Sequence, residues 1–311
     1  MGRRTGGITV LVAGCLAFTA SCGPAGEPAA LRMDDTLTDN VVTVGSFDFA
    51  ESVLLAEIYS QALERRGIEV ERQFALGPRE FVAPAVAVGL VELVPEYAGS
   101  AATFLGRGEV VPPDDPAAAH SLLVARLEPH PVVALDPAPG ENANAFVVTA
   151  ATAERYRLRS LSDVAEIAGE LVFGGPPECT RRTLCLVGLE DVYGIRFETV
   201  VSLDAGGPLS VQALRDGGID IALLFSSDPA LGGSELVELV DDRGLQPAEN
   251  ITPLIREELL EDRDATLVAA IDAVSARLST AELRELNAAF AGADGDPAPT
   301  ATEWLDRMGL P

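Results

Sequence analysis

The sequence predicts an α/β protein built from two similar lobes. After residue 40 the chain opens with the β-rich run Val41–Gly45, which ends in glycine. Residues 50–66 then repeat apolar side chains at helical spacing, and residues 68–74 carry a second short β-rich pattern. Apolar residues at positions i, i+3, i+4 and i+7 indicate a helix with one buried face. The strand–helix–strand order predicts a parallel sheet covered by helices.

An internal echo is the second observation behind this fold class. Residues 85–94 and 213–222 each have the pattern of a helix end, a glycine turn and a short strand that carries one acidic residue. A polar turn follows each segment, at 95–97 and 226–228. Residues 171–175 also repeat the device of a strand that ends in glycine. Two α/β units of the same design predict two lobes rather than one continuous sheet.

The domain organisation follows from these patterns. We expect a signal peptide over residues 1–22 and a flexible tether over 23–40, which is rich in Pro, Ala and Asp. Lobe one is predicted to comprise 41–145 and 250–311, and lobe two 146–249, with two crossings between them. Residues 279–282 and 300–303 both fit the capping-box pattern, which predicts helix starts at Ser279 and Thr300.

The N-terminus predicts export and attachment to a membrane by lipid. Arg3 and Arg4 precede an apolar run over 8–20, which is shorter than the roughly 20 residues that a bilayer crossing requires. The small residues that follow end at Cys22, and the segment 19–23 resembles a bacterial lipobox, although Thr19 replaces the common leucine. A plain secretory peptide is the alternative. We expect a lipid-anchored protein on the extracytoplasmic face of the bacterial cell membrane.

Two cysteines remain after processing, because Cys15 lies in the signal and Cys22 is the predicted anchor. In an oxidising compartment, Cys179 and Cys185 predict one disulfide that closes a small loop. A zinc site is the alternative, but zinc needs two further ligands, and both histidines lie in a separate region. We therefore predict no metal site.

The composition excludes several function classes. A net charge of −26 and a pI near 4.3 argue against nucleic-acid binding, which needs clustered Lys and Arg. The sequence contains no Gly-x-Ser-x-Gly, His-Glu-x-x-His, phosphate-binding P-loop or Gly-x-Gly-x-x-Gly motif. We therefore expect neither an enzyme nor a cofactor, and we predict no catalytic residue.

A family resemblance extends along nearly the whole mature chain. The sequence is similar to the substrate-binding proteins of glycine betaine/choline/osmoprotectant ABC importers, through motifs at residues 44–52, 57–64, 95–100, 174–179, 188–194, 225–228, 241–245 and 278–286. The resemblance implies a two-lobed type II periplasmic-binding-protein fold with a small solute in the cleft. It also implies an ABC permease and ATPase as partners and a monomeric receptor. A scaffold or sensor lipoprotein on the same fold is the alternative.

The resemblance also implies the site residues. Tyr97 matches an aromatic of the ligand cage, and Ser100 stands where the family usually places a hydroxyl that binds the ligand's polar end. Arg182 matches an arginine near the ligand carboxylate, although a shift of one residue would select Arg181. Phe225 replaces a cage tyrosine. The turn that contains Ser227 is expected to face Tyr97 and Ser100 across the cleft.

Departures from the family pattern concern the aromatic cage. The chain has four tyrosines in total, too few for the family's set of cage tyrosines once those in other roles are removed. Phe47, Phe146 and Phe225 are candidates to replace the missing rings. Because each lost cation–π contact costs about 0.5–2 kcal/mol, we expect glycine betaine and choline to bind weakly or not at all. A different, bulkier or more aromatic ligand is then expected to bind better.

Overall fold

The structure is a computed structural model that describes residues 2, 41–107, 114–262, 265–292 and 295–310. It contains two five-stranded sheets. The first has the order β2-β1-β3-β10-β4, in which β1 is parallel to β2 and β3, and β10 is antiparallel to both of its neighbours. Its strands are β1 (Val41–Gly45), β2 (Glu69–Gln73), β3 (Leu93–Tyr97), β4 (Val132–Ala134) and β10 (Ile251–Arg256).

The second sheet repeats this arrangement with the order β7-β6-β8-β5-β9. Here β6 is parallel to β7 and β8, and β5 is antiparallel to β8 and β9. Its strands are β5 (Asn144–Thr149), β6 (Val172–Gly175), β7 (Thr199–Ser202), β8 (Ile221–Phe225) and β9 (Leu236–Glu238). The two sheets therefore share one topology, as the internal echo predicts.

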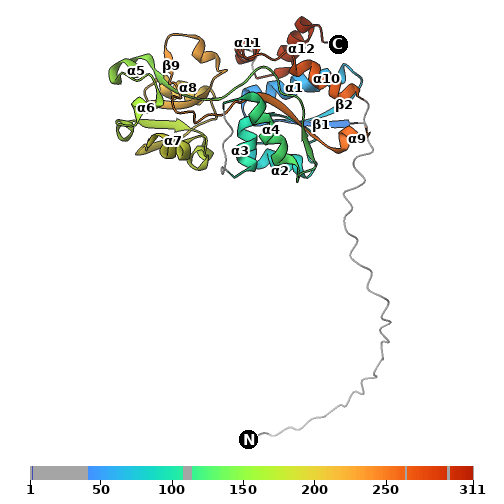
Figure 1. Ribbon diagram of the computed structural model, residues 1–311, viewed down its shortest axis with the longest axis horizontal. Helices are drawn as coiled ribbons and strands as arrows, with labels where there is room; N and C mark the ends of the chain where they lie inside the picture. Colours follow the sequence, from blue (N-terminus) through green and yellow to red (C-terminus); the bar gives the residue numbers. More distant parts are fainter. Residues whose placement is uncertain (1, 3–40, 108–113, 263–264, 293–294, 311) are drawn as a thin grey trace. The chain divides into compact units, whose positions relative to one another are not determined.

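Helices cover each sheet (Figure 1). Those that belong to the first sheet are α1 (Ala50–Glu64), α2 (Arg79–Ala87), α3 (Ala98–Leu105), α4 (Pro116–Leu127), α9 (Glu258–Asp262), α10 (Thr266–Ser275), α11 (Thr280–Ala291) and α12 (Pro297–Met308). Those that belong to the second are α5 (Ala150–Tyr156), α6 (Leu161–Val164), η2 (Ala168–Glu170), η3 (Pro177–Arg181), α7 (Leu186–Tyr193), α8 (Pro208–Arg215) and η4 (Pro229–Gly232).

The sheets and helices divide between the two lobes, and the chain crosses twice. The first crossing follows β4 and enters β5 at Asn144, and the second follows β9 and enters β10 at Ile251. We name the halves lobe one and lobe two after their sheets. The residue limits predicted from sequence stay a prediction.

Helix α1 illustrates how the sequence dictates the packing of lobe one. Its predicted stripe of Leu55, Ile58, Tyr59 and Ala62 is at most 4% exposed. The helix packs against α10 and α12, and the Tyr59 hydroxyl is 2.9 Å from the hydroxyl of Ser275 in α10. Burial of a hydrophobic stripe, at about 25 cal/mol per Å² of apolar surface, supplies most of the stability of such a helix.

The tail helices confirm one predicted start and correct the other. The Ser279 hydroxyl accepts a hydrogen bond from the Glu282 N–H at the start of α11. Helix α12, however, starts at Pro297 with Asp296 as its cap, so Thr300 lies inside the helix. The sequence pattern at 300–303 is misleading because Asp296 followed by Pro297 is an equally good start signal.

Two further predictions concern disulfide bonding and membrane crossing. Cys179 and Cys185 form the predicted disulfide, with their Cα atoms 5.3 Å apart. None of the helices in the described part of the chain combines the length and hydropathy that a bilayer crossing requires. The signal peptide, the tether and Cys22 lie outside the described residues.

Candidate solute-binding site

A cavity of about 650 Å³ lies between residues of both lobes. Its walls come from the segments that follow β1, β3 and β6, from the end of β8, and from α2 and the two crossings. The carboxyl ends of parallel strands and the loops that follow them are where open α/β sheets bind ligands. The predicted site residues Phe47, Tyr97, Ser100, Arg182 and Phe225 all line this cavity.

Aromatic rings form one wall of the cavity. The ring of Phe49 lies 5.8 Å from Phe47, 5.9 Å from Tyr97 and 5.1 Å from Phe225, measured between centroids. Phe49 thus joins lobe-one rings to the lobe-two ring of Phe225. Sequence reasoning did not select Phe49, although the alternation Phe47-Asp48-Phe49 could have indicated two rings on one side of an extended segment.

The four rings differ in how much they offer a ligand. Phe49 and Phe225 are partly exposed, whereas Tyr97 is 5% and Phe47 is 3% exposed. Phe47 packs under the Arg79 guanidinium, whose Cζ lies 5.1 Å from the ring centroid. Phe146 is buried at 2% exposure in the core of lobe two, where it packs near Phe173. The replacement of a cage ring by Phe146 is therefore not supported, because its side chain is enclosed by the core.

Tyr97 is held in place by a buried carboxylate. Its hydroxyl donates to Oε1 of Glu51 at 2.8 Å. Burial, and then the negative charge of Glu51, raise the pKa of Tyr97 well above its ordinary value, so the phenol stays protonated and remains a donor. The ring, rather than the hydroxyl, is the part of Tyr97 that can serve the cavity.

Glu51 collects hydrogen bonds from four segments of the chain. Besides Tyr97, the Asn142 amide donates to Oε1 at 2.8 Å, and Ser227 and Asn287 donate to Oε2 at 2.5 and 2.6 Å. Glu51 belongs to the first turn of α1, yet its role exceeds a favourable contact with the helix dipole. Its carboxylate joins lobe one, the first crossing, lobe two and α11.

Ser227 occupies a different place from the other predicted site residues. It is 1% exposed, it donates to Glu51, and it does not line the cavity. The end of β8 therefore contributes Phe225 to the cavity wall, and the turn after it contributes Ser227 to the polar network of Glu51. The chain turns between Phe225 and Ser227, where the Asp228 N–H donates to the Phe225 carbonyl, so the two side chains reach different surroundings.

Ser100 is engaged by a carboxylate that sequence reasoning missed. Both its N–H and its hydroxyl donate to Glu249, the N–H to Oε2 at 3.0 Å and the hydroxyl to Oε1. Burial raises the pKa of Glu249 to about 7, although the hydrogen bonds from Ser100 and the charge of Arg79 act in the opposite direction. Nothing in the sequence distinguishes Glu249 from the many acidic residues on the surface.

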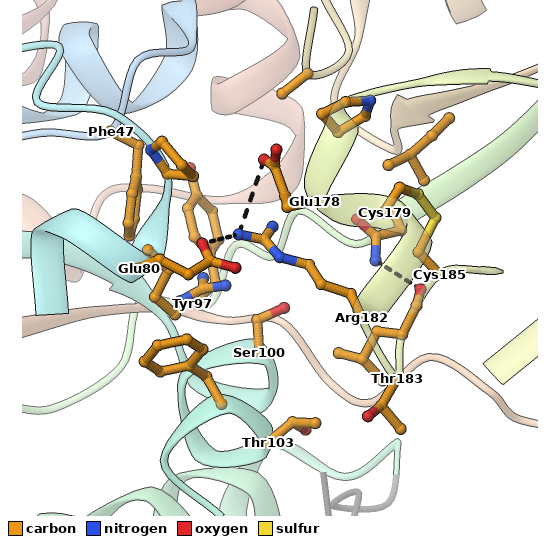
Figure 2. Close-up of a pocket in the computed structure, with 18 of the residues that line it drawn as sticks. Phe47, Glu80, Tyr97, Ser100, Thr103, Glu178, Cys179, Arg182, Thr183 and Cys185 are labelled. Carbon is orange, nitrogen blue, oxygen red and sulfur yellow. Dashed lines mark hydrogen bonds and ion pairs between the residues drawn. A yellow bond between two sulfur atoms is a disulfide. The ribbon is translucent and has the colours of Figure 1, made fainter. Parts of the chain in front are cut away.

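Arg182 reaches across the cavity from lobe two (Figure 2). Its Nη2 lies 2.8 Å from Glu80 Oε2 in α2 of lobe one and 3.8 Å from Glu178 Oε1. Burial tends to raise the pKa of Glu80, but the hydrogen bond and charge of Arg182 outweigh it, so the pKa lies below its ordinary value. Arg181 also lines the cavity, with an exposed side chain.

The disulfide supports the segment that carries both arginines. Cys179 is part of η3, Cys185 precedes α7, and residues 181–184 between them line the cavity. Figure 2 shows Arg182 and Thr183 next to the Cys179–Cys185 bond. Among the described residues no group of three or more His, Cys, Asp or Glu side chains is arranged to hold a metal ion.

Two lobes of equal topology around a cavity walled by rings and charges define a two-lobed solute-binding protein. Residues 40–307 match the OpuAC family, described as the substrate-binding domain of the ABC-type glycine betaine transport system. The chain belongs to this family, which confirms the resemblance inferred from the sequence motifs.

Individual relatives agree with this assignment. The chain is 27% identical over 278 residues to the glycine betaine-binding protein YehZ of Escherichia coli strain K12, which covers 86% of the chain and 90% of the relative. It is 26% identical over 273 residues to a glycine-betaine-binding protein of Pseudomonas aeruginosa, covering 84% of the chain and 86% of that protein. A crystal structure titled as a glycine betaine/carnitine/choline ABC transporter has a TM-score of 0.68 at 25% identity, covering 86% of the chain and 99% of its own.

Proposed function

We propose that this protein captures a small organic solute with a quaternary ammonium group in the cavity between its lobes. The observation that carries this proposal is the meeting of Phe49, Tyr97 and Phe225 at one wall, with ring separations of 5.1–5.9 Å from both lobes. A quaternary ammonium has no hydrogen-bond donor, so the quadrupoles of aromatic rings are what hold it. The names of the two bacterial relatives, both glycine betaine-binding proteins, support the same solute class.

The proposal includes closure of the lobes around the solute. Phe49 and Tyr97 belong to lobe one and Phe225 to lobe two, so each lobe supplies only part of the contacts. Two crossings connect the lobes, and such thin connections allow hinge motion. The closed receptor then delivers its solute to the ABC permease and ATPase, as substrate-binding proteins of this family do.

A ligand screen followed by titration calorimetry tests the solute class. We expect at least one of choline, glycine betaine, carnitine or a bulkier aromatic betaine to raise the melting temperature of the purified protein. Phe225→Leu should weaken the best ligand by about 2- to 30-fold, which corresponds to 0.5–2 kcal/mol for one ring. Phe197→Leu is the matched control, because Phe197 is a partly buried lobe-two ring that stacks on Phe173 and does not line the cavity.

Two outcomes would count against the proposal. If no quaternary amine in the panel binds, the solute class is wrong. If Phe225→Leu and Phe197→Leu have equal effects on affinity, the ring wall is not the binding surface. A response to amino acids or polyphenol-like aromatics alone would redirect the assignment to another solute.

We further propose that the receptor is a monomer anchored to the cell membrane through an acylated Cys22. The short apolar run and the small residues before Cys22 support this anchor. Replacement of Cys22 by Ser should move the protein from the membrane fraction to the soluble fraction. Unchanged partitioning would disprove the lipid anchor and leave the solute proposal unaffected.

A further inference from the structure

We propose that Glu249 sets the charge of the solute: it accepts a hydrogen bond from a cationic ligand and disfavours a ligand carboxylate. This inference rests on the proposed function, since it assigns the polar end of the same cavity. The preferred solute is then a quaternary ammonium that carries an O–H or N–H donor, rather than a zwitterionic betaine.

Glu249 has the position that this role requires. It lies in the second crossing, just before β10, and it lines the cavity although the residue is only 1% exposed. Ser100 donates one hydrogen bond to each of its two oxygens, and this fixes the carboxylate plane. A carboxylate has about four lone-pair sites. One site on each oxygen therefore remains for a ligand donor.

The neighbouring cations are already engaged by other carboxylates. Arg79 donates to both oxygens of Glu96, from Nε at 2.8 Å and from Nη2 at 2.9 Å. Arg182 donates to Glu80. Within the described part of the chain, no basic side chain lies within ion-pair distance of Glu249. Arg107 and Arg181 also line the cavity, but the acceptor that Ser100 holds is a carboxylate that forms no ion pair with a basic side chain in the described part of the chain.

A buried carboxylate without its own cation is costly to keep ionised. A cationic ligand supplies the missing partner, whereas a ligand carboxylate adds a second negative charge at short range. The arrangement thus discriminates by charge through repulsion as well as attraction, which is the general requirement for specificity. Ser100 contacts Glu249 and Arg182 contacts Glu80. In this proposal the two residues position those carboxylates.

The proposed role of Glu249 predicts that ligand affinity depends on pH. With a pKa of about 7 in the free protein, Glu249 is protonated below neutrality and ionised above it. The groups that face it from the elements packed around it are Arg79 of α2 and Glu96 of β3. A cation that needs ionised Glu249 should bind about tenfold more weakly near pH 6 than near pH 8, since each pH unit below the pKa costs tenfold. A zwitterion should show the opposite trend.

The experiment compares three probes by titration calorimetry on the full-length protein. Choline has a hydroxyl donor, its O-methyl ether lacks that donor, and glycine betaine replaces it with a carboxylate. We expect choline to bind tightest, and Glu249→Gln to weaken choline by about tenfold to a hundredfold, the value of a hydrogen bond to a charged group. The same variant should tighten or leave unchanged the binding of glycine betaine, and it should remove the pH dependence of both.

A control variant completes the design. Glu170→Gln removes an exposed carboxylate of lobe two that does not line the cavity. This variant should keep the wild-type ratio of choline to glycine betaine affinity and the wild-type pH trend.

The outcomes separate this inference from the function on which it rests. If quaternary amines bind but Glu249→Gln changes neither the affinity ratio nor the pH trend, the role of Glu249 is wrong and the proposed function stands. The role of Glu249 is equally wrong if Glu170→Gln removes the pH trend as fully as Glu249→Gln does. If none of the three probes binds but another quaternary amine of the screen does, this inference is wrong and the proposed function stands. If no quaternary amine binds the wild-type protein, the proposed function and this inference fail together.

Discussion

The two lobes use one scaffold for two different purposes. Strands β3 and β8 occupy the same central position in their sheets, and each ends in a ring that lines the cavity, Tyr97 in β3 and Phe225 in β8. The registers agree too, since Val44 pairs with Leu93 in the first sheet and Phe173 with Ile221 in the second. The equivalence places one aromatic side chain from each lobe at the cavity wall.

The acidic residue of each echo has the same structural task. In lobe one, Glu92 accepts a hydrogen bond from the Thr43 N–H at 2.9 Å. In lobe two, Asp220 accepts one from the Val172 N–H at 2.8 Å. Each carboxylate lies just before its own strand, β3 or β8, and accepts a hydrogen bond from the neighbouring parallel strand, β1 or β6. The echo in the sequence thus records a shared sheet design rather than a pair of functional sites.

The loops after the equivalent strands β1 and β6 differ completely. After β1, residues 46–49 bring Phe47 and Phe49 to the cavity. After β6, a proline, a short 3₁₀-helix and a disulfide bring Arg182 instead. Lobe one therefore supplies most of the rings, and lobe two supplies the charged segment. Shared strand geometry with divergent loops is how one fold hosts many functions.

Among the variants proposed here, removal of the Glu51 carboxylate should cause the largest loss in the free energy of unfolding, because this carboxylate connects the two lobes. Glu51→Ala leaves the donors of Tyr97, Asn142, Ser227 and Asn287 without their common acceptor in a buried site. Breaking a buried charged network costs about 3–5 kcal/mol. We expect a loss of that size in the free energy of unfolding, measured by urea denaturation.

The matched control for Glu51 is Glu154→Ala on the exposed surface of α5, which should change the free energy of unfolding by less than about 0.5 kcal/mol. Glu51→Gln keeps the shape and part of the acceptor capacity, so its loss should lie between the two. A loss below about 1 kcal/mol for Glu51→Ala would mean that the four donors find other partners and that the network does not join the lobes.

The shared scaffold could be predicted from the sequence more fully than the site. Local patterns indicate the strand Val41–Gly45 and the helix and strand that follow it, and the echo identifies the equivalent strand ends at Tyr97 and Phe225. These features depend on neighbouring residues, which is what periodicity can detect. The family resemblance then selects Phe47, Ser100 and Arg182, all of which line the cavity.

The missed residues are those whose role depends on partners far along the chain. Glu249 meets Ser100 across 149 positions, and Glu80 meets Arg182 across 102. In a chain with 48 Asp and Glu residues, no local pattern separates a buried carboxylate from a solvated one. For the same reason the sequence indicates only a helix-dipole contact for Glu51, because its position near a helix start is visible and its four donors are not.

Loss of the disulfide, which lies entirely within lobe two, should cause the second-largest decrease in the free energy of unfolding. Replacing Cys179 and Cys185 together by Ala should lower the free energy of unfolding by about 2 kcal/mol, from the loop-entropy estimate for a short closed loop. Reduction should mimic the double variant in differential scanning calorimetry. Ligand affinity should also fall, because the loop carries Arg182 and Thr183 at the cavity wall. Unchanged stability and affinity on reduction would show that the loop holds its form without the bond.

The third prediction tests whether the two sheets really share their design. Asp220→Ala and Glu92→Ala should each cost about 1–3 kcal/mol, since each leaves a strand N–H without its carboxylate acceptor. Glu92 is 6% exposed, whereas Asp220 is partly exposed, so the Glu92 loss should be the larger of the two. Urea denaturation of both variants is the measurement. A negligible cost at one site alone would break the equivalence of the lobes.

The contact between Arg182 and Glu80 should give the smallest effect, and it is specific to the interface between lobes. Both side chains are partly exposed, at 30% and 28%, so a double-mutant cycle with Arg182→Ala and Glu80→Gln should give a coupling of about 0.2–1 kcal/mol. Because the folded-state pKa of Glu80 is lowered, its stabilisation is present above the unfolded-state value of about 4.3 and is lost as the pH falls through the lowered value. The coupling should therefore persist at neutral pH and vanish as the pH falls through the lowered pKa of Glu80. The pair Arg196–Glu190 lies within lobe two, with side chains 76% and 45% exposed, and serves as the control. Ligand that closes the lobes should strengthen the Arg182–Glu80 coupling and leave the control pair unchanged. An equal response of both pairs would mean that Arg182 and Glu80 form an ordinary surface contact and do not report on closure.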